Sequence, residues 1–343
     1  ADALAISDST GNSFHLAGSL LDLSNTTVTL KLMGETGSDT FVHTLASGEP
    51  AIRMANSNLS LTGGGRALVN FGVDSGPAIT QGGVALIATN TSGTTKTINV
   101  TGQLLRMSGV NLTDTNTQVQ LSNMTVSASS NMLQINSNTG ATSVSLAGPL
   151  LSDTGGTLST SGTFLLAFGL SGGGTLNSAT ASPLIQFTNT TLTTGSFLIV
   201  SDPSSAINLK GSLLNATNSS LTVNGFALVS VFASSSLTTS ATTAPLINLS
   251  GGSLTLGTGV RAVHMGGFFL SSPSATLSGP LFKADGTTIT PSQTFPFIEI
   301  SGGASLTTGG SILDLTNTSL NLGTQPLSSL TGGSTLTNTA GPV

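Results

Sequence analysis

Pairs of adjacent apolar residues recur along this chain, and a further apolar residue follows each pair at a fixed distance. In residues 244–257 (A-P-L-I-N-L-S-G-G-S-L-T-L-G) the pair is Leu246-Ile247, and Leu254 lies seven positions after Ile247. Polar residues alternate with apolar ones on both sides of the Gly-Gly turn, as in a strand with one buried face. The same offset predicts a repeated unit of two short strands: Leu21 to Val28, Ile52 to Leu59, Leu105 to Leu112, Leu151 to Leu158, Ile185 to Leu192, Leu214 to Leu221, Ile247 to Leu254, Phe282 to Ile289, and Leu313 to Leu320.

Asn or Gly lies three positions before the second apolar residue of each unit. These two residue types enter the left-handed backbone region at the lowest energetic cost, so each unit is expected to bend sharply between its strands. Sustained helical periodicity is absent, and Asn, Gly and β-branched residues disfavour helices throughout. The bend positions are Asn25, Asn56, Gly109, Gly155, Asn189, Asn218, Gly251, Gly286 and Asn317.

Many strand–bend–strand units at a regular spacing predict a solenoid, in which stacked coils bury one continuous core. The expected fold class is all-β: residues 1–343 form one elongated, right-handed parallel β-helix without a linker. Wider loops are expected in residues 70–101 and 170–181, where the repeat is less regular. Neighbouring units are about 16 residues apart, and every second unit gives a period of about 32 residues.

A coil of about 32 residues is favoured over one of about 16, because short coils would stack the like charges of Glu299 and Asp314. Long coils stack compatible charges instead: Asp22 on Arg53, Lys283 on Asp314, and His264 on Glu299. At about 4.8 Å per coil the rod would be roughly 50 Å long. The expected row of stacked residues is Leu21, Ile52, Leu86, Val119, Leu151, Ile185, Leu214, Ile247, Phe282 and Leu313.

The composition excludes several classes of function. Charged residues make up 6% of the chain, with a net charge of −5, eight Lys and Arg residues, and no Cys, Trp or Tyr. So few basic residues offer no patch for nucleic acid, and the lack of Cys removes disulfides and thiolate metal sites. No apolar run of about 18 residues is present, so no transmembrane helix is expected. The low charge, the Ser, Thr, Asn and Gly bias and the start at Ala1-Asp2-Ala3 predict a processed, exported bacterial protein, extracellular or on the cell surface.

No catalytic, cofactor-binding or metal-binding residue is predicted. A polysaccharide-cleaving β-helix needs acids clustered on one face, and the best pair available is Glu299 and Asp314, at equivalent outward positions. Asp153 and Asp285 are interpreted as turn formers. Three histidines lie far apart in the sequence and are interpreted as surface residues rather than metal ligands: His15, His43 and His264.

Ser or Thr flanks the inward residue of many second strands. Stacked in coils, these residues would form two parallel outward ranks of hydroxyls. Such ranks are typical of a solvated pleated face, and they are also similar to the T-x-T arrays of ice-binding solenoids. The candidate ladder is Thr27, Thr29, Thr191, Thr193, Ser220, Thr222, Ser253, Thr255, Thr288 and Thr290, continued by Ser305, Thr307, Thr335 and Thr337.

The segments L-L-D-L-S-N-T-T-V-T-L (20–30) and S-I-L-D-L-T-N-T-S-L-N-L (311–322) resemble the repeats of filamentous-haemagglutinin-like and autotransporter-passenger β-helices. The resemblance implies a secreted or surface-displayed protein that adheres to cells, to matrix or to its own kind. It carries over no functional residue. We therefore expect a non-enzymatic structural or adhesive protein that assembles with copies of itself into a filament or surface layer.

Solenoid ends expose strand edges, which pair with other strands unless polar caps cover them. No cap is recognisable near either end of the sequence, so the assembly interface is expected at Leu4, Ile6, Leu327, Leu330, Leu336 and Val343. The expected partners are copies of the chain, with cell-surface polysaccharide or host matrix as further candidates, and no cofactor. Three alternatives stay open: a surface adhesin acting as a single rod, a carbohydrate-active β-helix enzyme, and an ice-binding solenoid.

Overall fold

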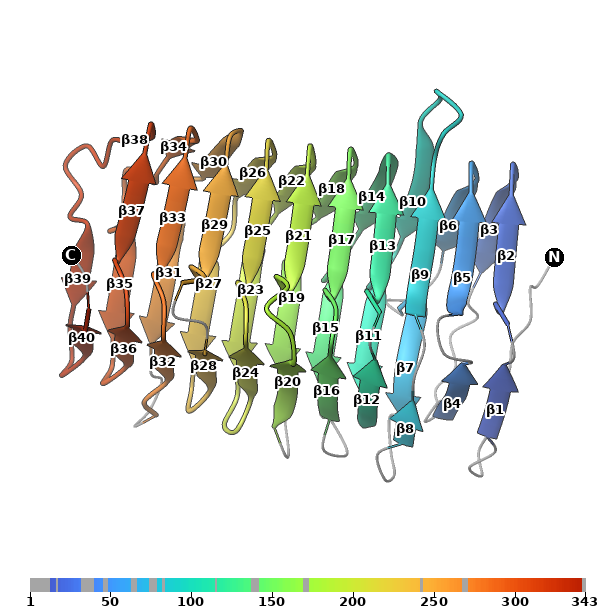
Figure 1. Ribbon diagram of the computed structural model, residues 1–343, viewed down its shortest axis with the longest axis horizontal. Coiled ribbons are helices and arrows are strands. Elements are labelled where there is room, and N and C mark those ends of the chain that lie inside the picture. The colour runs from blue at the N-terminus through green and yellow to red at the C-terminus, as the bar shows by residue number, and fades with distance from the viewer. Residues whose placement is uncertain are drawn as a thin grey trace.

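The computed structural model describes residues 13–16, 18–31, 40–45, 49–62, 67–73, 79–81, 84–114, 116–136, 142–168, 173–240, 243–266 and 271–340. Within these residues the regular structure consists of strands, joined by turns and bends. The chain passes through four sheets in turn, and from β5 onward each coil adds one strand to every sheet (Figure 1).

The first and second sheets each contain ten described strands. The first sheet contains β2 (Leu21–Ser24), β5 (Pro50–Ala55), β9 (Val84–Thr89), β13 (Val119–Ser122), β17 (Leu151–Thr154), β21 (Ile185–Thr188), β25 (Leu214–Thr217), β29 (Ile247–Ser250), β33 (Phe282–Asp285) and β37 (Leu313–Thr316). The second sheet contains β3 (Thr27–Lys31), β6 (Asn58–Thr62), β10 (Lys96–Val100), β14 (Met124–Ala128), β18 (Thr157–Thr160), β22 (Thr191–Thr194), β26 (Ser220–Val223), β30 (Ser253–Leu256), β34 (Thr288–Thr290) and β38 (Ser319–Leu320).

The third sheet contains eleven described strands and the fourth contains nine. The third sheet contains β1 (Ser13–Leu16), β4 (Thr40–Leu45), β7 (Val69–Val73), β11 (Leu105–Ser108), β15 (Leu133–Asn136), β19 (Thr163–Phe168), β23 (Ser196–Ser201), β27 (Ala227–Phe232), β31 (Arg261–Gly266), β35 (Ile298–Ser301) and β39 (Ser328–Leu330). The fourth sheet contains β8 (Ile79–Gln81), β12 (Val110–Asp114), β16 (Thr142–Leu146), β20 (Gly174–Ser178), β24 (Ala206–Leu209), β28 (Ser236–Thr239), β32 (Ser274–Leu277), β36 (Ser305–Thr308) and β40 (Thr335–Asn338).

Strand pairing confirms the parallel solenoid and the coil of about 32 residues. Ile247 pairs with Leu214 on one side and with Phe282 on the other, and the whole predicted row from Leu21 to Leu313 is in register along the first sheet. The 16-residue unit is half of a coil, spanning either the first and second sheets or the third and fourth. One described pairing is antiparallel, between β4 and β7.

The predicted charge stacking is also present. Asp22 pairs in register with Arg53 and Lys283 with Asp314, with side-chain nitrogen–oxygen distances of 3.9 Å and 3.8 Å. His264 of β31 lies beside Glu299 of β35 on the third sheet. A coil of 16 residues would have produced none of these pairs.

Left-handed residues turn the chain between sheets, as the sequence predicts. Asn218 (φ 50°) and Gly251 (φ 70°) turn it between the first and second sheets in consecutive coils. All nine predicted bend positions have a positive φ, and Asn123 (φ 54°) forms the same corner without having been predicted. Asn tolerates this conformation better than other residues with a Cβ, which explains why it alternates with Gly here.

The core runs the length of the rod between the four sheets. In the stretch around Gly251, Ile247, Leu249, Leu254 and Leu256 are each at most 3% exposed. Full burial of one aliphatic side chain contributes about 1.5–3 kcal/mol, and each coil repeats the same inward positions. Aromatic rings fill the middle of the rod: Phe164 stacks on Phe197 at 5.2 Å between centroids, and Phe187 meets both rings edge-on.

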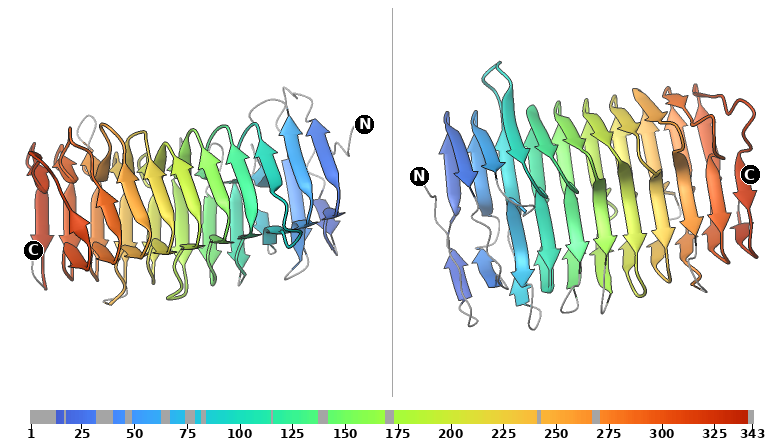
Figure 2. Two further views of the ribbon diagram at one scale, coloured as in Figure 1. Left: turned by 90° about the horizontal axis from the view of Figure 1, so that it is seen from above. Right: turned by 180° about the vertical axis from the view of Figure 1, so that it is seen from behind.

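The stacked coils form an elongated body, with β1 and β40 toward its opposite ends (Figure 2). No helix in the described part of the chain is long and apolar enough to cross a membrane.

Candidate functional site

The predicted hydroxyl ladder lies on the outer face of the second sheet. Thr191 pairs with Ser220, and Thr193 pairs with Thr222. The residues before and after each inward leucine therefore form two separate ranks that run as rows across the strands. All ten predicted positions occupy these ranks, from β3 to β34. The ranks mix Ser and Thr, and two of the strands add Asn58 and Asn99.

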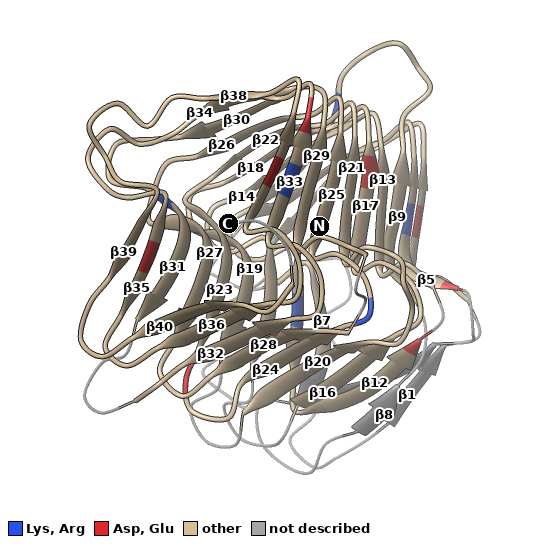
Figure 3. Ribbon diagram, turned by 60° about the vertical axis from the view of Figure 1, so that its left-hand side comes forward, with Lys and Arg blue, Asp and Glu red and all other residues tan. Residues whose placement is uncertain are grey.

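A second pair of polar ranks lies on the fourth sheet. Ser305, Thr307, Thr335 and Thr337 belong to this face, so the prediction that they continue the ladder of the second sheet is wrong. Amide side chains link neighbouring coils here, as Asn208 Nδ2 donates to Asn177 Oδ1 at 2.9 Å. The described strands of the second sheet from β14 to β34 carry no charged residue (Figure 3).

Three of the predicted assembly residues lie in the last described coil, residues 313–339. Leu327 and Leu336 are half-buried against the core, and Leu330 is 43% exposed. Strands β37 to β40 each pair with one neighbouring strand only among the described residues. Their apolar side chains are therefore less covered than those of the coils before them. The other predicted residues, Leu4, Ile6 and Val343, lie outside the described residues.

The structure does not bring together Glu299 and Asp314, the best acid pair that the sequence offers for a polysaccharide-cleaving enzyme. Glu299 lies on β35 in the third sheet, whereas Asp314 lies on β37 in the first sheet. The two positions are equivalent within the half-coil repeat, but consecutive half-coils face different sides of the rod. Among the described residues, no group of three or more His, Cys, Asp or Glu residues could hold a metal ion.

A cluster of aromatic and charged side chains covers the third sheet toward the C-terminal half. We call it the third-sheet cluster: Phe226, Ser230, Phe232, Arg261, His264, Phe295 and Glu299. Its centre is Arg261, whose Nε donates to Glu299 Oε2 at 2.5 Å. The guanidinium lies 3.6 Å from the ring centroid of Phe295 and 5.0 Å from that of Phe226. Contact with two aromatic rings restrains the guanidinium and shields the ion pair from water.

His264 points outward as predicted but is not a surface residue, since it is only 8% exposed. Its ring packs edge-on against Phe226 at 4.7 Å and lies 5.1 Å from Phe232. Burial lowers the pKa of His264 to about 4, while the nearby Glu299 raises it and Arg261 lowers it. The imidazole is therefore neutral at pH 7.

Ser230 is the register neighbour of His264, so serine, histidine and glutamate follow one another across β27, β31 and β35. The order resembles a nucleophile–base–acid relay, yet the contacts do not form one. Ser230 Oγ and His264 Nδ1 have no hydrogen-bond partner, and Ser230 is fully buried. Glu299 is bonded to Arg261 instead of orienting the imidazole. The arrangement is suited to holding the face of the sheet together, and it lacks the linked contacts of acyl transfer.

Asp153 lies just before the corner at Gly155, as the turn interpretation expects, and its side chain accepts hydrogen bonds from the Gly156 and Thr154 backbone. It lies in β17 and points into the core, where its exposed fraction is 0%. The Thr190 hydroxyl donates to Asp153 Oδ2 at 2.7 Å. Burial raises the pKa of Asp153 to about 6, although hydrogen bonds from Thr190, Gly156 and Thr154 lower it. The burial of Asp153 could have been predicted from the sequence, because Asp153 occupies an inward position in the alternation of its strand.

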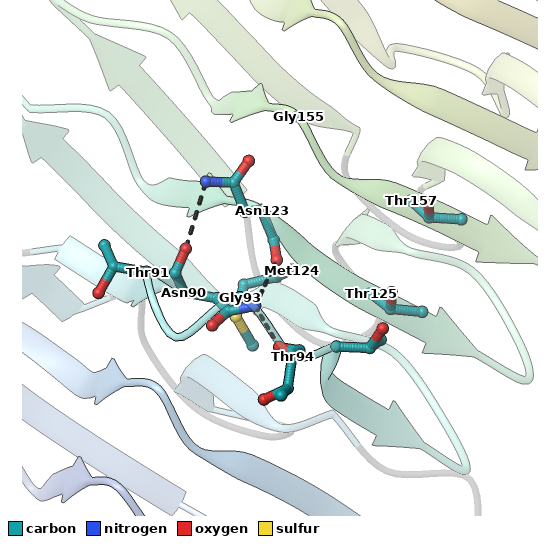
Figure 4. A pocket seen from close by; sticks show the side chains of 10 residues that line it. Asn90, Thr91, Gly93, Thr94, Asn123, Met124, Thr125, Gly155 and Thr157 are labelled. Carbon is teal, nitrogen blue, oxygen red and sulfur yellow. Dashed lines mark hydrogen bonds between the residues drawn. The ribbon is translucent and has the colours of Figure 1, made fainter.

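A shallow groove lies at the corner between the first and second sheets, beside a loop of residues 90–95 (Figure 4). Its volume is about 450 Å³, and its lining includes Asn90, Thr94, Asn123, Thr125 and Thr157. The loop falls within residues 70–101, where a wider loop was predicted. The groove itself was missed, because nothing in the repeat indicates how adjacent corners differ in height.

Comparison of the chain with protein-family models, with curated proteins and with solved structures gives no match. The β-solenoid repeat architecture is therefore supported by strand pairing alone, and kinship with haemagglutinin-like or autotransporter proteins stays a prediction.

Proposed function

We propose that this chain is a non-enzymatic structural or adhesive rod of an extracellular protein, and that it assembles with copies of itself through the edges of its coils. The observation that supports self-association most directly is the last described coil. It adds one strand to each of the four sheets, as the coils before it do, and its leucines are only half covered. A β-edge with matching apolar side chains is a template for another coil.

The outer faces of the sheets also support a structural rather than an enzymatic role. From β14 to β34 the second sheet presents no charged side chain, and its hydroxyl groups suit contact with water or with polar partners. Low charge reduces the repulsion between copies that would oppose assembly. The composition supports an extracellular location, which labelling of intact cells with an antibody against the rod would test.

The experiment that tests self-association compares sedimentation of the protein with that of two lysine variants. Leu330→Lys places a charge at the inward position of β39, where a further coil would pack. Thr193→Lys adds the same charge to the exposed outer face of β22, far from that coil. We expect the protein and Thr193→Lys to sediment as concentration-dependent oligomers, and Leu330→Lys to remain monomeric with an unchanged circular dichroism spectrum. Monomers of all three at every concentration would refute assembly through the coil edge.

A further inference from the structure

The corner groove differs from every other described corner between the first and second sheets because six residues, 90–95, separate β9 from β10. In the next coil, Asn123 alone separates β13 from β14. The longer loop rises above its neighbours at the edge of the rod (Figure 1). It makes a step, and the groove lies at the foot of that step, over β14 and β18.

Side-chain hydrogen bonds hold the loop from both sides. Asn90 is 7% exposed, and its Nδ2 donates to the carbonyl oxygens of Thr94 (2.8 Å) and Asn123 (3.2 Å). In return, Asn123 Nδ2 donates to the carbonyl oxygen of Asn90 at 3.2 Å. On the other side, the Thr91 N–H donates to Asn56 Oδ1 at 2.7 Å. A loop fixed in this way presents its polar groups without an ordering penalty on binding.

The groups that line the groove are neutral hydrogen-bonding groups. Thr125 and Thr157 are in-register neighbours on the outer face of the second sheet, so their hydroxyls recur at the strand spacing of about 4.8 Å. Thr94 adds a hydroxyl from the wall of the step. The side-chain amide oxygen of Asn123 (Oδ1) lies above Gly155, where any Cβ would collide with it. No ionisable side chain is among the lining residues, and Lys96, the nearest charge in sequence, is not one of them.

This chemistry selects among ligand classes. An anion or cation would find no opposite charge in the lining, and an apolar ligand would have to desolvate amides and hydroxyls without replacing their hydrogen bonds. A sugar hydroxyl both donates and accepts, as a threonine hydroxyl does, and it also bonds to a side-chain amide. We propose that the groove binds a neutral saccharide unit through Thr94, Asn123, Thr125 and Thr157. The site depends on the groove alone and not on assembly through the coil edge.

The test uses the whole chain, labelled with ¹⁵N, and follows backbone amide resonances during titration with three oligosaccharides. Cellotetraose and chitotetraose are the neutral probes, and trigalacturonate is the charged one. We expect at least one neutral probe to shift the amides of residues 90–95, 123–125 and 155–157 at millimolar concentration, and trigalacturonate to leave them unchanged.

Two pairs of matched variants locate the contact. Asn123→Gly removes the amide but keeps the left-handed corner, and Asn218→Gly makes the same change in a corner without the loop. Thr157→Val removes one hydroxyl in the groove, and Thr288→Val removes one further along the same sheet. Asn123→Gly and Thr157→Val should each weaken binding about three- to tenfold, as expected for one lost hydrogen bond. Asn218→Gly and Thr288→Val should leave binding unchanged.

Three outcomes would overturn the proposal. The first is the absence of shifts at the groove with both neutral probes up to 20 mM, on the order of the weakest affinity that a few hydrogen bonds provide. The second is equal weakening by the groove variants and their controls, which would assign binding to the hydroxyl face in general. Trigalacturonate binding as tightly as the neutral probes would likewise contradict a site that recognises neutral sugars.

Discussion

The Asp153 carboxyl group faces the core of the rod from β17, and this makes it the residue whose charge state matters most for stability. Burial raises its pKa from 3.8 to about 6, so between these pH values the folded chain holds a proton that the unfolded chain has released. The stabilisation is fully present below about pH 3.8 and is lost as the pH rises through about 6. A core acid thus makes the middle of the rod more stable in weak acid.

We predict that the free energy of unfolding falls by about 2 kcal/mol more in the wild-type chain than in Asp153→Asn between pH 4.5 and pH 7.5. Asparagine cannot ionise, so it removes this pH dependence while keeping a polar group opposite Thr190. Urea unfolding at the two pH values measures the difference. Parallel pH profiles for the two proteins would show that Asp153 ionises in the fold as it does in the unfolded chain.

The asparagine corners give a second prediction at this scale. Asn218 has φ 50°, a conformation that costs alanine about 1–2 kcal/mol and glycine almost nothing. Asn218→Ala should lower the free energy of unfolding by about 1 kcal/mol, and Asn218→Gly should stay within a few tenths of the wild type. Denaturation curves of the two variants measured side by side provide the comparison. Equal losses in both would mean that the amide, rather than the backbone conformation, holds the corner.

At the scale of strands, the outer face of the third sheet is held differently from the other faces. The Arg261–Glu299 pair has side-chain exposures of 11% and 25% and is covered by Phe295 and Phe226. The Lys283–Asp314 pair on the first sheet is more than 40% exposed on both sides. Only the covered pair is shielded enough from water to affect stability strongly.

Arg261→Ala should therefore lower the free energy of unfolding by about 2 kcal/mol, since it leaves Glu299 unpaired and removes the plane on which two rings pack. Lys283→Ala should change it by less than about 1 kcal/mol. Guanidinium unfolding is unsuitable because it screens charges, so urea or heat should be used. A loss of similar size in both variants would show that the aromatic cover does not strengthen the pair.

The strands were predictable because their spacing follows from the repeat alone. The offset of seven gives both strands of each unit, and Asn or Gly before the second strand gives the bend, so Leu214, Ile247 and Phe282 could be placed in one row. Features that break the repeat were not predictable. The cover over His264 depends on Phe226, Phe232 and Arg261 from separate strands or loops, and their meeting is fixed only by the coil size.

Half-coil symmetry also explains why Glu299 and Asp314 are the best acid pair in the sequence pattern yet lie apart in the structure. The two residues occupy the same place in a 16-residue unit, so the sequence pattern treats them as equivalent. Charge pairing favours the longer coil, and that coil puts consecutive units on different sheets. The same reasoning moves Ser305 and Thr335 from the second sheet to the fourth.

At the scale of the whole molecule, each strand of the described coils pairs with the equivalent strand of the next coil. The inner coils are covered on both faces by their neighbours, and the first and last described coils each pair with a neighbour on one face. A rod built in this way can lengthen by adding any coil with the same four-sided outline. We therefore expect the partly exposed leucines of residues 313–339 to mediate association between copies. The hydroxyl-bearing faces would then form the outer surface of the assembly.

Electron microscopy of the purified protein, negatively stained over a range of concentrations, tests this account most directly. Single chains would be rods roughly 50 Å long, given about ten coils at about 4.8 Å each. The account predicts filaments or layers built from such rods joined end to end at high concentration, and single rods for Leu330→Lys under the same conditions. A uniform field of single rods at every concentration would contradict assembly through the coil edge.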